Sequence, residues 1–418
     1  MEQHRFDPHA SRTDVRPDLD GHPAAVNYGA APPRGASARS GWAAGIAALV
    51  GAALMGLSCG GGIGGGQQGS LPTTQVGRSS RLLEDLAWTA LLPQYQAMTA
   101  SFGTLDDAIA AFCDAPAAAG LDATRAAWRS AMESWVAASM FQLGPIAEDN
   151  RALRIEFWPD ANNNVPRAVE QMLVRDDTLS ADTLARQSVA AQGLPALERL
   201  LFDPEADALV EFTSGDRAAR RCTYARAIGG NLLGIARAVE AAWASDGGYA
   251  TQLASAGRGS DVFATREAAI DEVVNGLFTA LSASRDDRLA GPLGGDTAAE
   301  AKSFRAESVW SGNSFANLAA SLRGAQAIYD GRAGFGFDDY LRASSRDALA
   351  SQITETFASL QAEITALPVT LAEAVQDEDL RPRVVALLDH ATTLAGLIET
   401  DLSSAMDVKI GFNSNDGD

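Results

Sequence analysis

The sequence predicts an all-α fold of two helical bundles packed together, and three observations lead to that prediction. Alanine and leucine are abundant, runs of β-branched residues are rare, and charges are spread through apolar segments, a balance that favours helix over sheet. Apolar residues recur at spacings of three and four almost throughout the region 79–418. A Gly- and Ser-rich stretch at 246–260 divides this region into halves at about 79–246 and 260–418.

The first half reads as a series of helices separated by proline and polar residues. The stretch 82–91 repeats apolar residues at three and four, and Pro93 is expected to kink or break this helix. A second helix is expected over 105–113 with Thr104 as its N-cap, followed by a strongly amphipathic helix over 122–142. Further helices are predicted at 166–174, 180–191, 194–202 and 216–245.

The second half repeats the helical pattern. Leu349, Ile353 and Phe357 keep the three-and-four spacing of a bundle helix, and Pro368 marks its end. Eight or more helices joined by short links imply antiparallel packing in two bundles. The helices of this half are predicted at 261–284, 297–330, 338–367 and 380–406.

The formal net charge is -20, and the N-terminal tail does not produce it, because basic and acidic residues balance there. A field of this sign repels phosphate backbones, so we do not expect nucleic-acid binding. The charge either serves solubility alone or attracts cations and basic partners.

Histidine placement limits the chemistry that the chain can perform. His4, His9 and His22 precede the helical region, and only His390 lies within it. One imidazole cannot build a multi-histidine zinc site, so any metal would be a hard cation held by oxygen ligands. His390 lies in an apolar helix, which leaves serine or cysteine nucleophilic catalysis without a base.

The N-terminus is similar to the leader of a bacterial lipoprotein. The first forty residues are rich in Pro, Gly, Ser, Ala and charge, a composition typical of disorder. Two arginines then precede a short apolar run at 42–57, which ends in a small residue before Cys59. We therefore predict a disordered N-terminus with a lipoprotein-type signal peptide over 1–59, and a membrane anchor through lipidation of Cys59. A cytosolic chain with a buried apolar tail is the alternative.

The residues after the cysteine specify the setting further. Gly60, where an aspartate would be expected in a retained lipoprotein, points to the outer membrane of the cell envelope. The Gly-rich stretch 60–78 is predicted to be a flexible tether, so that the helical domain is held near a membrane surface but is free to turn.

Two cysteines, Cys113 and Cys222, lie in the helical region. In an oxidising periplasm such a pair is typical of a disulfide, which would stabilise the fold by about 4–5 kcal/mol through the chain entropy of a long loop. Two small buried thiols are the alternative.

The segment 144–166 interrupts the helical rhythm, with proline near both ends and a high density of charge and aromatic residues. Long irregular stretches inside helical domains are often functional. Its charged and aromatic side chains could line a cleft or form a salt-bridged cap over the bundle, and weak exposed ion pairs favour the cap slightly. The candidates are Arg151, Arg154, Glu156, Trp158 and Asp160.

Four segments, in order along the chain, resemble the imelysin family in its periplasmic lipoprotein branch. The resemblance extends over residues 80–418 and implies an all-helical fold of two bundle-like halves around a shared cleft. It also implies a periplasmic or cell-surface setting, frequently tied to the acquisition of iron or other metals. The segments are FQLGP at 141–145 with EDNRALRIEFWPD at 148–160, QGLPALERLLFD at 192–203, AESVWSGNSFANLAASLRG at 306–324 and KIGFNSNDGD at 409–418.

The family carries a G-x-H-x-x-E motif, whose histidine and glutamate lie on one helical face and could share a metal ion. Here Gly193 and Glu198 match the motif, but Pro195 stands at the histidine position. Proline has no ligand atom, so a His/Glu metal pair cannot form, whereas proline suits the first turn of a helix. We interpret Gly193 to Pro195 as a helix start. Glu198 is either structural or a functional carboxylate, for instance an oxygen ligand of a divalent or ferric cation.

A similar family-like spot lies in the second half. Trp310 is expected to be a core residue, Gly312 to allow close approach of helices, and Asn313 to belong to the same candidate binding region.

The resemblance also implies a link to peptidase activity. The sequence has no zinc-binding histidine pair and no H-E-x-x-H motif, so we predict that the chain is not an enzyme. The preferred hypothesis is a surface-anchored or periplasmic binding module, which holds an unknown periplasmic ligand, protein or metal between its halves and serves iron or metal acquisition. A metallopeptidase and a structural envelope protein are the alternatives.

Overall fold

The computed structural model describes residues 74–408, which belong to one compact unit of the chain. The predicted signal peptide, Cys59, most of the predicted tether and the family-like terminus at 409–418 lie outside the described residues. Within the described range, no helix is both long enough and apolar enough to cross a membrane.

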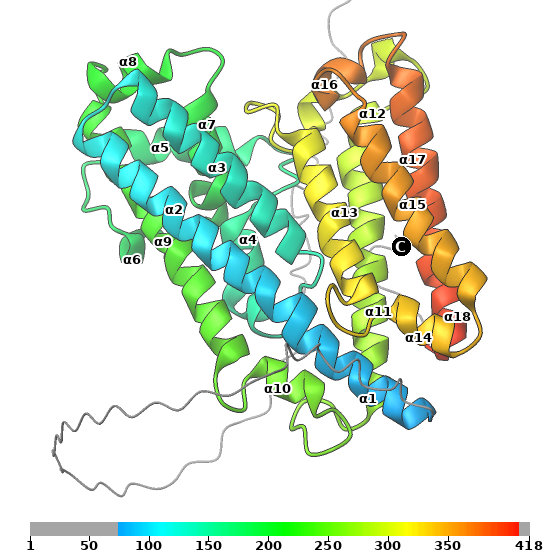
Figure 1. Ribbon diagram of the computed structural model, residues 1–418. Helices are drawn as coiled ribbons and strands as arrows, with labels where there is room; N and C mark the ends of the chain where they lie inside the picture. The colour runs from blue at the N-terminus through cyan, green and yellow to red at the C-terminus, as the bar shows by residue number, and fades with distance from the viewer. Residues whose placement is uncertain (1–73, 409–418) are drawn as a thin grey trace, which may run out of the picture. The chain divides into compact units, whose positions relative to one another are not determined.

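The described residues form helices and no β-strand, which confirms the all-α prediction. Figure 1 shows them in two groups, one from each half of the chain. The first group is built on α2 (Leu92–Asp114), α3 (Ala118–Ala138) and α9 (Ala218–Ala244). The second is built on α11 (Arg266–Ala283), α13 (Ser314–Asp330), α15 (Asp347–Thr365) and α17 (Arg381–Gly396).

The first helices form one continuous stretch instead of the two predicted. Helix α1 (Gln75–Asp85) passes through a π-helical segment, Leu86–Leu91, directly into α2. Pro93 therefore does not break the helix, and we attribute this to the wide π turns before it, whose hydrogen bonds skip the usual i−4 partner. Thr104 is not an N-cap, because it lies inside α2 and its hydroxyl donates to the carbonyl of Ala100 at 3.1 Å.

The start of α1 also corrects the predicted end of the tether. The Thr74 side chain caps α1 by accepting the N–H of Gly77 at 3.1 Å, and Ser79 is already buried. Residues 75–78 are therefore helical, because a capping threonine starts the helix before the apolar pattern becomes visible.

The remaining elements of the first half are short. The helix predicted at 180–191 is divided into α6 (Ala181–Leu184) and a 3-10 turn at Val189–Ala191, since Ser180 and Ser188 each cap a separate start. The other helices are α4 (Arg151–Ile155), α5 (Asn164–Val174), α7 (Gly193–Phe202), α8 (Ala208–Thr213) and α10 (Tyr249–Ala254).

Cys113 near the end of α2 and Cys222 near the start of α9 form a disulfide, with their Cα atoms 5.5 Å apart. The bond links two helices that pack against each other along their length.

Two predicted helices of the second half are shorter than expected. Only the C-terminal part of 297–330 is the helix α13, because Ser308 adopts a left-handed conformation and the chain before Ser314 forms loops and 3-10 turns. The helix predicted at 338–367 is interrupted at Ser345, which is also left-handed. The shorter elements are π Ser284–Ala290, α12 (Gly291–Leu293), α14 (Phe337–Ala343), α16 (Leu371–Ala374), π Leu397–Leu402 and α18 (Ser403–Met406).

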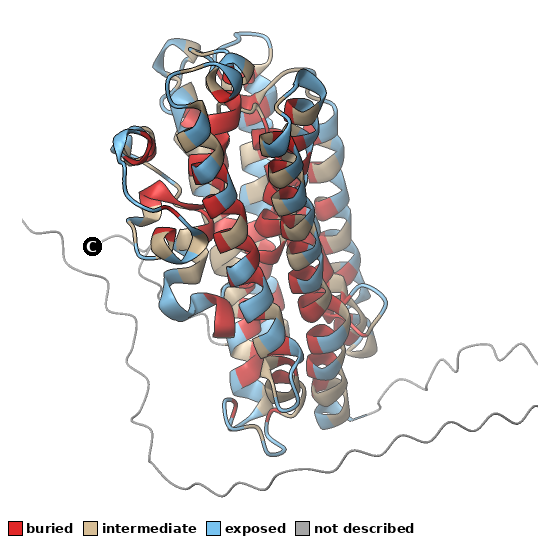
Figure 2. Ribbon diagram, turned by 90° about the vertical axis from the view of Figure 1, so that its left-hand side faces the viewer, coloured by how far each residue is buried: buried red, intermediate tan, exposed pale blue. Residues whose placement is uncertain are grey.

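The two halves pack through α3 and α13. Gly324 permits this contact, because a Cβ atom at this position would lie 2.2 Å from the carbonyl oxygen of Ala137. Helix α1 additionally lies against α11 and α14, so the first helix of the chain contacts the second half. Figure 2 shows that the buried residues occupy the inward faces of the helices while their outward faces are exposed.

Candidate functional site

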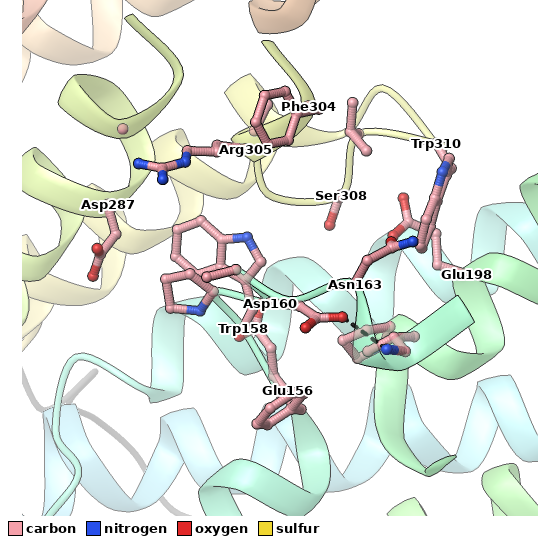
Figure 3. Close-up of a pocket in the computed structure, with 18 of the residues that line it drawn as sticks. Glu156, Trp158, Asp160, Asn163, Glu198, Asp287, Phe304, Arg305, Ser308 and Trp310 are labelled. Atoms are coloured by element: carbon pink, nitrogen blue, oxygen red, sulfur yellow. Dashed lines mark hydrogen bonds between the residues drawn. The ribbon is translucent and has the colours of Figure 1, made fainter. Parts of the chain in front are cut away.

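A cavity of about 320 Å³ lies where loops and helix ends of the two halves meet. Three family-like segments supply most of its wall, and Figure 3 shows their side chains. The volume is near the lower end of the range of about 300–1,000 Å³ that is usual for small-molecule sites. The charged residues that line the cavity are Glu156, Asp160, Glu198, Asp287 and Arg305.

Gly193 fixes the position of α7, the helix that carries the family-like motif. Its φ of +81° lies in the left-handed region, and a Cβ atom would lie 2.3 Å from the carbonyl oxygen of Ile155. Only glycine allows this close approach of α7 to the end of α4. Gly193 therefore has a structural role, and it does not line the cavity.

Pro195 lies in the first turn of α7, as the sequence predicted, and forms part of the cavity wall. The position at which the family motif has histidine therefore faces the cavity. A proline there contributes an apolar surface and no atom that could bind a metal or transfer a proton.

Glu198 lies one turn further along α7 and is 3% exposed. Its Oε1 accepts the backbone N–H of Ser311 at 2.8 Å, which ties the first half to the loop before α13. Burial raises the pKa of Glu198 to about 7, and hydrogen bonds from Ser311 and the backbone of Trp310 oppose the rise. The side chain is therefore a buried carboxyl group close to its titration point at neutral pH.

Asp160 shapes the loop that carries Trp158. Its Oδ2 accepts the N–H of Val165 at 2.7 Å, and its Oδ1 accepts the side-chain amide of Asn164 at 3.1 Å. Both oxygens of Asp160 are thus used at the start of α5. Trp158 lines the cavity, and the guanidinium of Arg288 lies 5.4 Å from its ring centroid.

Glu156 and Glu307 bring two buried carboxyl groups together. The indole N–H of Trp135 donates to Oε2 of Glu156 at 2.6 Å, and Arg288 contacts Oε1 of Glu307 at 2.8 Å. Burial, followed by the charge of Glu307, raises the pKa of Glu156 well above its usual value. This shift favours the neutral form of the Glu156 carboxyl group beside Glu307. Oε1 of Glu156 and Oε2 of Glu307 have no hydrogen-bond partner among the described residues.

The loop before α13 is held by polar contacts within the second half. Asn313 is buried and donates to the side chain of Asn317 at 2.7 Å, and Asn317 in turn donates to the hydroxyl of Ser308 at 2.9 Å. Gly312 has a φ of +68° in the turn before α13, and a Cβ atom there would lie 3.0 Å from Cγ2 of Thr370, the N-cap of α16. Neither Gly312 nor Asn313 lines the cavity.

Trp310 is half-buried, packs against the core and also lines the cavity. The guanidinium of Arg199 lies 5.4 Å from its ring centroid and is paired with Asp203 at 2.5 Å. Trp310 lies in the loop that precedes α13, which begins at Ser314, and is therefore not part of a bundle helix.

Arg151 and Arg154 do not reach the cavity. Arg151 donates to the carbonyl of Pro145 at 2.6 Å and pairs with Glu148, which is a local cap. Arg154 donates to Asn231 at 3.0 Å and to the buried Gln192 at 3.3 Å, and so connects α4, α7 and α9. The predicted segment does line the cavity, but the side chains of these two arginines make their contacts elsewhere.

Four charged residues of the site were not among the sequence candidates. Asp287 and Arg288 lie in the π-helical segment after α11, whereas Arg305 and Glu307 lie in a stretch predicted to be helical. Glu307 is inside a family-like segment, and that was the one available signal. Asp287, Arg288 and Arg305 belong to no motif. They come close to the cavity only through the fold of the second half.

The residues of this cavity do not fit a metal centre. The described residues contain no group of three His, Cys, Asp or Glu side chains that could hold a metal ion. His390 lies on α17, pairs with Glu363 at 2.8 Å and is not part of the cavity wall. Pro195 has no ligand atom, so a His/Glu metal pair cannot form at the motif.

Comparisons with known proteins agree with this geometry. The family model for peptidase M75, described as imelysin, matches residues 91–398. Iron-regulated protein A of Synechococcus elongatus is 26% identical over 336 residues, which is 78% of this chain and 86% of that protein.

Two solved structures share the fold. An imelysin-like protein from Psychrobacter arcticum has a TM-score of 0.67 at 21% identity, with 81% of this chain and 98% of that chain covered. A protein described as an iron-regulated protein A precursor, from Parabacteroides distasonis, has a TM-score of 0.66 at 15% identity, with 81% and 97% covered. The resemblance inferred from the sequence is thereby confirmed, and the chain belongs to the imelysin family.

Proposed function

We propose that this chain is an exported imelysin-like lipoprotein that binds a ligand in the cavity between its two halves and serves iron acquisition without catalysing a reaction. The observation that carries the proposal is the cavity itself. It lies where three family-like segments meet, and Pro195 forms its wall at the position of the family's histidine.

The chemistry of the wall favours binding over catalysis. Three indole rings and four carboxyl groups line it, and the described residues place no histidine or cysteine in it. A metallopeptidase needs a metal that activates water, and residues 74–408 contain no group of three His, Cys, Asp or Glu side chains that could hold one. The aromatic and acidic side chains can still hold and orient a ligand.

The names of related proteins support the link to iron. A cyanobacterial relative is called iron-regulated protein A, and a structural relative is described as its precursor. The word precursor is consistent with export, which the lipoprotein-like sequence around Cys59 also supports.

A growth experiment tests the role in iron acquisition. In the organism that encodes the chain, deletion of the gene should slow growth when iron is limiting and leave growth in iron-rich medium unchanged. The wild-type gene and a Trp88→Ala variant should restore growth, because Trp88 is exposed and does not line the cavity. A Trp158→Ala variant, which removes one wall of the cavity, should not restore it. Equal growth of the deletion strain and its parent under iron limitation would overturn the proposal.

Incubation with a peptide library separates binding from catalysis. The purified chain should leave all peptides intact, both with and without added zinc. Cleavage that disappears in a Glu198→Gln variant would contradict a non-catalytic role and support the peptidase alternative.

Fractionation of cells tests the anchor. The wild-type chain should be recovered with the membranes and should carry a lipid at Cys59 by mass spectrometry, whereas Cys59→Ala should be recovered without that lipid. An unmodified Cys59 in the membrane-associated wild type would contradict the anchor.

A further inference from the structure

Acidic groups outnumber basic groups in the wall of the cavity. Four carboxyl groups, those of Glu156, Asp160, Glu198 and Asp287, line it together with one guanidinium, that of Arg305. With every group ionised the formal charge of the lining is -3, and with Glu156 neutral it is -2, while the whole chain carries -20. An anionic ligand would have to overcome this field, whereas a cation would gain from it.

The four carboxyl groups are not equally available to a ligand. Glu156 accepts the indole N–H of Trp135, and burial raises its pKa and so favours its neutral form. Both oxygens of Asp160 accept hydrogen bonds at the start of α5. Glu198 receives its donors only from the stretch 310–311, although a carboxylate offers about four lone-pair sites. Asp287 accepts no hydrogen bond from any described residue. Glu198 and Asp287 are thus the two carboxylates that can receive a donor from a ligand.

Glu198 and Asp287 lie at opposite ends of the cavity in Figure 3, with Trp158 between them and Trp310 beside Glu198. Glu198 is the more deeply buried of the two. A charge-assisted hydrogen bond is stronger where water is excluded, so a cationic group gains most at Glu198.

The walls are suited to a flat apolar body. Indole rings of Trp128, Trp158 and Trp310 line the cavity together with Phe157, and Phe304 at its edge is 72% exposed. An exposed phenylalanine beside an aromatic cavity is apolar surface that a ligand can cover. Aromatic faces also attract organic cations.

We propose that this cavity binds an organic ammonium ion with an aromatic body, placing the ammonium group at the carboxylate of Glu198 and the ring among the tryptophans. The inference rests on the proposed function, because it names the class of ligand for the same cavity. A bare metal ion is not favoured, since the described carboxyl and imidazole groups do not gather in threes.

Isothermal titration calorimetry with three indole compounds tests the proposal directly. Tryptamine, tryptophol and indole-3-propionate carry the same ring with an ammonium, a hydroxyl and a carboxylate group. With the purified full chain at pH 8, tryptamine should bind at least about tenfold more tightly than tryptophol, as expected when a charge-assisted hydrogen bond is gained. Indole-3-propionate should bind most weakly. Equal affinity for tryptamine and tryptophol, or tighter binding of indole-3-propionate, would overturn the inference.

Variants locate the ammonium group. Glu198→Gln keeps an oxygen that can accept the N–H of Ser311, and it should lower the affinity for tryptamine about tenfold while leaving that for tryptophol unchanged. The matched control is Asp286→Asn, since Asp286 neighbours Asp287, is exposed and does not line the cavity. It should bind tryptamine as the wild type does. A tenfold loss in Asp287→Asn with no loss in Glu198→Gln would contradict the assignment to Glu198.

The same titrations separate this inference from the proposed function. If tryptophol binds as well as tryptamine, the cavity is a binding site but not one for cations. If the growth defect under iron limitation is absent while tryptamine binds selectively, the ligand class stands and the role in iron acquisition fails.

Discussion

Replacing Glu198 by glutamine should remove a pH-dependent loss of stability. Burial is the largest cause that raises the pKa of Glu198 from 4.5 to about 7, and the charge of Glu307 adds to it. The folded chain therefore retains a proton that the unfolded chain loses. The free energy of unfolding accordingly falls as pH rises through this window, and the loss is complete once the pH exceeds the folded pKa. The full loss is about 3 kcal/mol, at about 1.4 kcal/mol for each pKa unit.

The effect is measured as a difference between two pH values. The loss due to Glu198 grows from about 1 kcal/mol at pH 5 to about 3 kcal/mol at pH 8. Relative to the wild type, Glu198→Gln should therefore gain about 2 kcal/mol of stability between these pH values, because glutamine does not ionise. Any constant effect of the new amide cancels in this comparison.

Urea denaturation followed by circular dichroism provides the measurement. The control is Glu355→Gln, since Glu355 is exposed on α15 and should show the same stability difference from the wild type at both pH values. A Glu198→Gln variant that loses stability between pH 5 and pH 8 relative to the wild type would refute the reasoning.

Three further changes test the packing. Gly193→Ala should lower the free energy of unfolding by at least about 3 kcal/mol, because a left-handed conformation and a backbone clash act together. Gly234→Ala, on an open helical face, should instead raise it by about 1 kcal/mol. The midpoints of urea denaturation distinguish the two results. Serines in place of Cys113 and Cys222 should lower the unfolding free energy by about 2–5 kcal/mol in the same assay, and an unchanged midpoint would contradict a stabilising disulfide. Gly324→Ala should lower the melting temperature measured by calorimetry, since the added methyl group forces α3 and α13 apart, and an unchanged temperature would argue against their close contact.

The helical fold could be predicted because long amphipathic helices leave a clear period of three and four. The period does not report where a helix begins within a polar loop. The stretch 297–313 was predicted to be helical because it contains alanine and apolar residues, yet Ser308 and Gly312 adopt left-handed conformations there. Such interruptions depend on tertiary contacts, and the spacing of apolar residues does not encode them.

The site could be predicted at the level of segments and less well at the level of side chains. Trp158, Asp160, Glu198 and Trp310 line the cavity because the family-like segments that contain them meet there. Arg154 lies in one of the same segments, but its guanidinium turns to the buried side chains between α4 and α9. Arg288 contacts Glu307 and Ser284 through the fold of the second half and reaches Trp158 only when the two halves pack together, and no local pattern marks it, Asp287 or Arg305.

Hydrogen–deuterium exchange with and without tryptamine at pH 8 is the most direct test of the claim that the cavity binds a ligand. Peptides from three separate parts of the chain, 155–165, 193–200 and 303–313, should exchange more slowly when tryptamine is present, while exchange on α15 and α17 stays the same. Protection of all three segments would support a shared site between the halves. Unchanged exchange in these segments, or protection confined to one half, would contradict it.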